Sequence, residues 1–104
     1  MNENKFSYES DVIESDETDI SYPGKYNVIM HNDDYTTMEF VVLVLLKIFN
    51  HTRQNAEILM QTIHEKGKAV AGTYTLEIAE TKVSETMTMA QNEQYPLKCT
   101  IEEV

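Results

Sequence analysis

Asn32, Asp33 and Asp34 are consecutive short polar residues, and they are the best candidates for chemistry in this chain. Amide, carboxylate and neutral imidazole groups all carry hydrogen-bond acceptors, so His31 and the more distant His64 could extend the set. Asn and Asp are also common turn formers. The cluster therefore indicates a turn between two elements, a site for a hydrogen-bond donor, or both.

Catalytic and metal sites are two possible uses of these residues. A general acid–base pair would combine Asp33 or Asp34 with His31 or His64, but no Ser or Cys nucleophile motif accompanies them. The same side chains could bind a metal, although their spacing matches no specific ligand pattern. We therefore expect a protein that is not an enzyme and that has no cofactor and no metal site.

A binding site for an ammonium group beside an apolar side chain fits the residues better. Met38, near the start of one predicted helix, and Met60, in a second, would supply adaptable apolar walls. The free N-terminus of a peptide is such a ligand, and its capture is a known recognition mode.

The elements on both sides of the cluster must hold it in place. Residues Lys25 to His31 alternate between apolar and polar faces, which indicates a half-buried strand. Thr36 and Glu39 match the T-x-x-E capping box, which predicts a helix from Thr37 to about Asn50. Its run FVVLVLLKIF is apolar almost all round, so this helix is buried on most sides or offers one side to a partner.

The rest of the chain continues the alternation of elements. Thr52 is a good N-cap for a second helix that ends at Gly67, and a strand over Lys68–Tyr74 follows. Thr75 can cap a third helix, and a third strand covers residues 97–102. The order β-α-α-β-α-β predicts a two-layer α+β domain with three helices on one face of a three-stranded, mainly antiparallel sheet.

Charge divides the chain into two parts. The sequence has 104 residues and a net charge of −10, and residues 1–22 hold seven acids and one base. We expect a disordered acidic N-terminal arm over 1–22 and one folded domain over 23–104, with Pro23-Gly24 at the boundary. The acidic balance argues against nucleic acid, no apolar run could span a membrane, and the lone Cys99 suits a cytoplasmic setting.

Four blocks of the sequence resemble one known family. NDDYTTMEFV, LMQTIHEKGKAV, TLEIAETK and YPLKCTIEE occur in the order and spacing of the bacterial ClpS adaptor family, from about Tyr22 to Val104. That resemblance implies a fold like the C-terminal domain of ribosomal protein L7/L12, which agrees with the element order above. It also implies an adaptor that binds proteins beginning with Leu, Phe, Tyr or Trp, the N-degrons of the N-end rule. The adaptor would deliver these substrates to the AAA+ unfoldase ClpA for degradation by ClpP.

The resemblance also implies roles for matching residues. Those that would bind the substrate α-amino group are Asn32, Asp33 and His64, and those that would shape the pocket entrance are Asp34 and Thr36. The apolar pocket wall would consist of Met38, Val41, Met60, Ile63 and Leu97. Glu77 and Lys82 would face the N-terminal domain of the unfoldase. The adaptor is expected to act as a monomer.

Three positions depart from the family pattern. Thr37 replaces a frequent Pro, His31 replaces an apolar residue, and Val44 replaces a polar one. His31 could add charge near the pocket at low pH, and Val44 leaves open how much of the first helix is exposed. Two rival hypotheses remain, namely an L7/L12-like docking module without a substrate pocket and a small metal or acid–base protein that uses Asp33 and His64.

Overall fold

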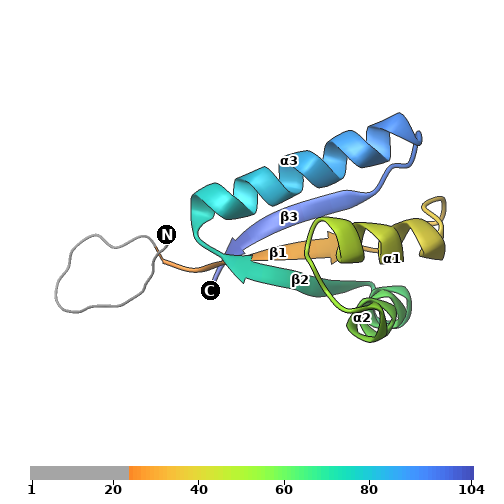
Figure 1. Cartoon of the computed structure of the whole chain (residues 1–104), viewed down its shortest axis with the longest axis horizontal. Coiled ribbons are helices and arrows are strands. Elements are labelled where there is room, and N and C mark those ends of the chain that lie inside the picture. The colour runs from red at the N-terminus through yellow and green to blue at the C-terminus, as the bar shows by residue number, and fades with distance from the viewer. Residues whose placement is uncertain (1–23) are drawn as a thin grey trace, which may run out of the picture.

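A computed structural model describes residues 24–104, which form six elements around a three-stranded sheet (Figure 1). They follow the chain as β1 (Tyr26–His31), α1 (Met38–Lys47), α2 (Arg53–Lys66), β2 (Lys68–Tyr74), α3 (Leu76–Asn92) and β3 (Lys98–Glu103). The predicted element order and fold class are confirmed. The predictions for residues 1–22 and for the boundary at Pro23 lie outside the described residues.

β1 is the central strand of the sheet, which has the order β2-β1-β3. Both pairings are antiparallel, with His31 opposite Lys68 in β2 and Lys98 in β3. Val28 and Met30 join the hydrophobic core with residues from all three helices. His31 follows them in the alternation of the strand and therefore points to the opposite face. The helices thus pack against the face of the sheet that carries Val28 and Met30. Figure 1 shows α3 running alongside β3.

The start of α1 differs from the prediction by one residue. Thr37 is the N-cap, and its hydroxyl accepts a 3.1 Å hydrogen bond from the backbone N–H of Phe40. The predicted capping box at Thr36 and Glu39 is wrong, because the Thr36 hydroxyl instead donates to the Asp33 carboxylate at 2.8 Å. The helix also ends at Lys47 rather than near Asn50, whose φ of 60° is left-handed.

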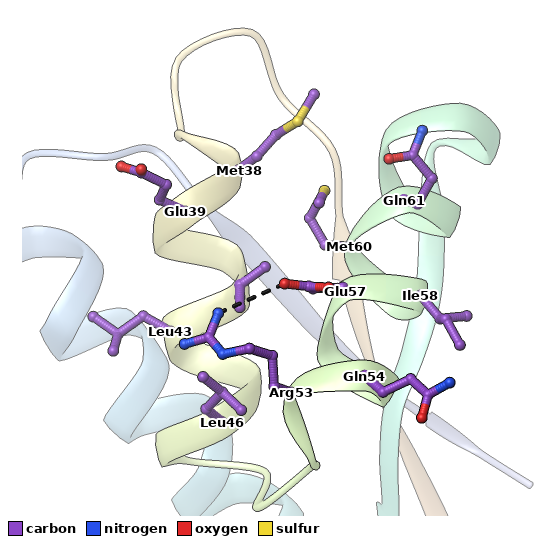
Figure 2. Close-up of a pocket in the computed structure, with 11 residues that line it drawn as sticks. Met38, Glu39, Leu43, Leu46, Arg53, Gln54, Glu57, Ile58, Met60 and Gln61 are labelled. Carbon is purple, nitrogen blue, oxygen red and sulfur yellow. Dashed lines mark ion pairs between the residues drawn. The ribbon is translucent and has the colours of Figure 1, made fainter.

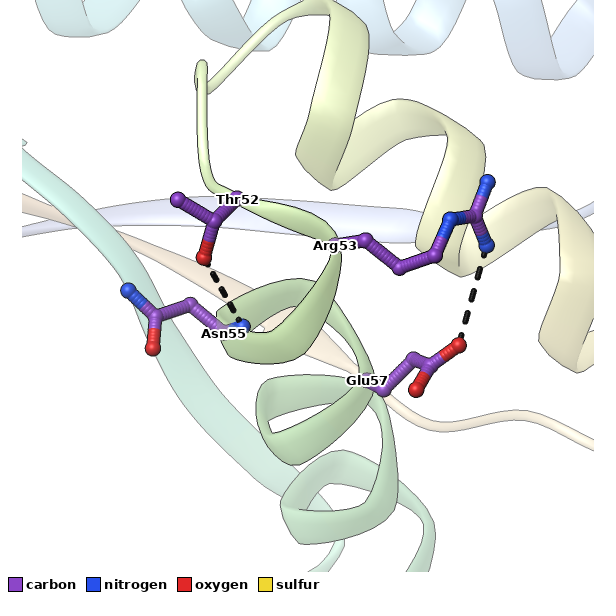
Figure 3. Close-up of polar contacts among 4 residues, drawn as sticks. All are labelled: Thr52, Arg53, Asn55 and Glu57. Atoms are coloured by element: carbon purple, nitrogen blue, oxygen red, sulfur yellow. Dashed lines mark hydrogen bonds and ion pairs between the residues drawn. The ribbon is translucent and has the colours of Figure 1, made fainter.

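The ends of α2 agree with the sequence signals. The Thr52 hydroxyl accepts from the backbone N–H of Asn55 at 3.2 Å (Figure 3). Gly67 closes the helix with a φ of 94°, a conformation that costs a residue with a Cβ atom about 1–2 kcal/mol. Thr75 occupies the N-cap position of α3, but its side chain makes no capping hydrogen bond.

A bulge in β2 explains the position of His51, which lies between α1 and α2. Val28 pairs with Gly72 and Ile29 pairs with Val70, so Ala71 is the extra residue. The Ala71 carbonyl accepts a 2.6 Å hydrogen bond from His51 Nε2, which satisfies a buried backbone group outside the ladder.

Gly72 is needed for packing within β2. An ideal Cβ built there would lie 2.6 Å from Tyr74 Cζ, so the tyrosine ring occupies the space that a side chain would fill. The Tyr74 ring also packs against Phe49, with 6.4 Å between ring centroids. An aromatic side chain therefore makes the close approach at Gly72.

The core explains two further residues singled out in the sequence. Val44 is fully buried, so its departure from a polar residue adds to the core and not to an exposed face. Burial raises the pKa of the Cys99 thiol to about 12, which keeps it protonated and suits a packing role. Among residues 24–104, no helix is long and apolar enough to cross a membrane.

Candidate functional site

The turn after β1 is organised by one carboxylate. Asp33 Oδ1 accepts hydrogen bonds from the backbone N–H groups of Tyr35 at 2.8 Å and Thr36 at 2.7 Å. Asp33 Oδ2 accepts from the Thr36 hydroxyl at 2.8 Å. The sequence predicted that Asp33 would be a turn former, and the contacts confirm this part of its role.

These contacts also set the charge state of Asp33. Partial burial works to raise the pKa of the carboxyl group, but hydrogen bonds from the Thr36 N–H, the Thr36 hydroxyl and the Tyr35 N–H outweigh it. The net effect holds the pKa of Asp33 below its ordinary value. Asp33 therefore carries a fixed negative charge at neutral pH, at the mouth of α1.

Asn32 is joined to the far end of α2 by its backbone. Its N–H donates a 2.8 Å hydrogen bond to the carbonyl oxygen of Gly67. Gly67 in turn donates from its N–H to the carbonyl of Ile63 at 2.9 Å, one residue before His64. The side chains of Asn32 and His64 are both exposed. The segments that carry the predicted amine-binding residues are therefore held together.

His31 does not belong to this group. It points to the sheet face opposite the helices, where its Nε2 shares a 2.8 Å hydrogen bond with Thr100 Oγ1. Burial, then the cationic neighbours Lys98 and Lys68, lower the pKa of His31, and Glu102 only partly opposes them. This position and the direction of the pKa shift both argue against the expectation that His31 adds charge near the pocket at low pH.

The predicted apolar wall divides into two parts. Val41, Ile63 and Leu97 are buried in the core cluster, whereas Met60 is only partly buried against it. Met38, the first residue of α1, is 45% exposed. The two methionines are thus the members of the predicted wall that solvent reaches most easily.

A groove of about 870 Å³ runs between α1 and α2, and Met38 and Met60 line one end of it (Figure 2). Sequence reasoning missed the rest of its lining, which includes Val42, Leu43, Leu46, Arg53, Glu57 and Ile58. The sequence feature that could have indicated the groove is the nearly all-round apolarity of α1, which predicted either a buried helix or a helix with one apolar side exposed. In the structure most of α1 is buried, and its Leu43–Leu46 side borders the groove.

The two residues expected to face an unfoldase differ in their surroundings. Glu77 is exposed in the first turn of α3. Lys82 is partly buried, and its Nζ donates a 2.7 Å hydrogen bond to the carbonyl of Ile48, the C-cap of α1. The same ammonium lies 5.7 Å from the centroid of the Tyr74 ring. Lys82 therefore has an internal structural role that the sequence did not predict.

Within residues 24–104, the structure gathers no group of three or more His, Cys, Asp and Glu side chains that could hold a metal ion. The candidate site combines a negatively charged turn, a pair of exposed polar side chains and an apolar groove that begins at Met38. This combination suits a ligand that has a positive charge next to an apolar group.

Comparisons with known proteins agree on one family. Residues 21–100 match the sequence profile described as "ATP-dependent Clp protease adaptor protein ClpS". An ATP-dependent Clp protease adapter protein ClpS from Lawsonia intracellularis is 52% identical over 85 residues, which are 82% of this chain and 78% of the relative. Another, from Oleidesulfovibrio alaskensis, is 44% identical over 104 residues, the full length of both chains.

A solved structure has the same architecture. Agrobacterium tumefaciens ClpS2 bound to L-phenylalaninamide superimposes with a TM-score of 0.77 and 36% sequence identity. The match covers 80% of this chain and 100% of that one.

Proposed function

Because the chain belongs to the ClpS family of ATP-dependent Clp protease adaptor proteins, we propose that it binds proteins whose first residue is Leu, Phe, Tyr or Trp. The observation that carries this proposal is the 2.8 Å bond between Asn32 N and the Gly67 carbonyl. It holds the Asn32–Asp33 turn against the helix end that bears His64. The apolar groove is lined by Met38, which follows the turn, and by Met60, which lies one helical turn before His64.

The chemistry of each group fits a peptide N-terminus. The side chains of Asn32 and His64 would accept hydrogen bonds from the α-ammonium group, and the negative charge of Asp33 would favour its positive charge. Asp34 and Thr36 would form the entrance. The first side chain would enter against the apolar wall of Met38, Val41, Met60, Ile63 and Leu97.

The ligand of the solved relative supports this proposal. L-phenylalaninamide, bound to Agrobacterium tumefaciens ClpS2, has a free α-amino group and an aromatic side chain. These are the two features that an N-terminal phenylalanine would present. The carboxamide of that ligand takes the place of the peptide bond to a second residue.

Delivery to the protease is the second part of the proposal. We infer that the adaptor passes its substrate to a ClpA-type AAA+ unfoldase for degradation by ClpP. Glu77, exposed on α3, and Lys82, one turn further along, would face the N-terminal domain of the unfoldase. The acidic segment 1–22 would act on the unfoldase and not on the substrate pocket.

An array of peptides that differ only in the first residue tests the binding proposal. Peptides that begin with Leu, Phe, Tyr or Trp should bind, while those with Ala, Ser, Asp or Lys in the first position should not. Binding that is indifferent to the first residue would contradict the proposal and favour a docking module without a pocket.

A further inference from the structure

The groove between α1 and α2 extends well beyond the proposed contact for a first residue. Figure 2 shows Met38 and Met60 at one end, and the Arg53–Glu57 ion pair, 3.6 Å between Nη1 and Oε2, further along it. Val42 and Leu46 of α1 also line the groove, and Figure 2 shows Leu46 at the same end as Arg53. The groove thus has apolar lining along α1 and an exposed polar pair on α2 towards its far end.

The size of the groove exceeds what one side chain needs. Its volume of about 870 Å³ is near the upper end of the range of pockets that hold whole small-molecule ligands, roughly 300–1,000 Å³. Arg53 precedes Met60 by seven residues in α2, which corresponds to about 10 Å at about 1.5 Å per helical residue. An extended peptide covers that distance with about three residues, at about 3.3 Å each.

We propose that residues 2–4 of the bound polypeptide lie in this groove and that apolar side chains are preferred there. This inference rests on the proposed function, because the occupant is the polypeptide whose first residue binds beside Asn32 and His64. Met38 and Met60 belong both to the predicted wall for that residue and to the groove, so the two surfaces are continuous.

The far end of the groove suits the exit of the polypeptide to solvent. Arg53 and Glu57 are 69% and 56% exposed, and an ion pair so exposed contributes little to stability. The pair can therefore open at little cost. Its guanidinium can then donate to a peptide carbonyl and its carboxylate can accept from a peptide N–H.

Peptides that share N-terminal Phe and a constant remainder, but carry Gly-Gly-Gly or Leu-Leu-Leu at positions 2–4, test this inference on the full chain. The Leu peptide should bind at least about threefold more tightly, because its side chains leave water in the groove. N-acetylated versions of both peptides measure any binding that does not depend on the first residue. A Leu peptide that binds no better than the Gly peptide would overturn the inference.

Variants of the groove locate the effect. Leu46→Gln and Leu43→Gln should bring the Leu-to-Gly affinity ratio close to one, and affinity for the Gly peptide should be unchanged. Leu43 is the variant of choice if Leu46→Gln lowers the melting temperature, because Leu43 is 38% exposed. Leu76→Gln is the matched control, since Leu76 is also 38% exposed but does not line the groove.

The outcomes separate the two proposals. If the free Phe-Gly-Gly-Gly peptide does not bind, the proposed function fails. If it binds but both groove variants keep the wild-type affinity ratio, only this inference fails. A groove variant that keeps the ratio and instead changes self-association or unfoldase binding would assign the groove to a second copy or to the unfoldase, and would also overturn the inference.

Discussion

The backbone N–H of Asn32 lies 2.8 Å from the carbonyl oxygen of Gly67, and this hydrogen bond joins the end of β1 to the end of α2. One of these segments carries Asn32 and Asp33, and the other carries His64. They are far apart in sequence, and this hydrogen bond joins them. Their relative position therefore depends on the left-handed backbone of Gly67, whose φ is 94°.

Gly67→Ala should destabilise the fold by about 1–2 kcal/mol, because a Cβ atom strains the left-handed conformation. It should also weaken binding of a Phe-led peptide, since the carbonyl that holds Asn32 shifts. Thermal melts and calorimetric titration measure the two effects. Gly24→Ala is the control, because Gly24 is exposed and a Cβ there meets only Glu103 Oε2, at 3.6 Å. Wild-type binding by a destabilised Gly67→Ala would show that this link does not position the site.

Asp33→Ala should lower stability at neutral pH by about 1 kcal/mol, because three hydrogen bonds in a partly exposed turn are lost. The pKa of folded Asp33 is depressed, so its contribution is fully present above the ordinary aspartate pKa of about 3.9 and is lost as pH falls through the lower folded value. The difference between wild type and variant should therefore be constant above about pH 5 and shrink in acid.

Denaturant melts across this pH range measure that difference, and Asp34→Ala controls for the loss of an exposed neighbouring carboxylate. A stability difference between wild type and Asp33→Ala that stays the same in acid would mean that the charged form of Asp33 does not hold the turn.

The architecture was predictable because its signals are local. Thr52 and Gly67 mark the ends of α2 by capping chemistry that acts within one turn. The start of α1 was missed because Thr36 and Thr37 are both competent caps. The contact that decided between them is the Asp33 carboxylate, which takes the Thr36 hydroxyl. Two adjacent caps of equal propensity cannot be ranked without that geometry.

The site was less predictable because it depends on contacts between distant segments. Nothing in the sequence near Lys82 indicates that its ammonium reaches the Ile48 carbonyl, 34 residues earlier. Strand alternation could have placed His31 on the face away from the helices, because His31 directly follows the apolar Met30 in an alternating strand. That Lys68 and Lys98 are neighbours of His31 could be known only from the register in which the three strands pair.

Glu77→Ala and Lys82→Ala should separate delivery from folding. Glu77 is exposed, so its replacement should change stability by less than about 0.5 kcal/mol and reduce degradation of a Phe-led reporter. Lys82→Ala also removes a charged hydrogen bond to the Ile48 carbonyl, so it should lower the free energy of unfolding by roughly 1.5–3 kcal/mol as well as reduce degradation. Melts and reconstituted degradation assays give both readouts. Normal degradation with Glu77→Ala would remove this residue from the proposed unfoldase contact.

Met38→Ala should relax rejection of peptides that begin with Ile or Val. Met38 begins α1 and lines the groove beside the proposed amine site. A β-branched first residue carries its extra methyl group close to the bound amine, where it would collide with the methionine, whereas Leu branches one atom further out. Fluorescence-anisotropy titrations of Ile- and Leu-led peptides measure the ratio of the two affinities in wild type and in the variant. An unchanged ratio in the variant would assign the rejection to another residue.

The most direct test of the central claim compares a Phe-led peptide with the same peptide acetylated at its N-terminus, by calorimetric titration against the full chain. Acetylation removes the positive charge that would face Asp33 and leaves the acceptors of Asn32 and His64 covered but unpaired, at about 1–3 kcal/mol each. We predict that the free peptide binds and that binding of the acetylated peptide is lost. Equal affinities for the two peptides would contradict recognition of the α-amino group.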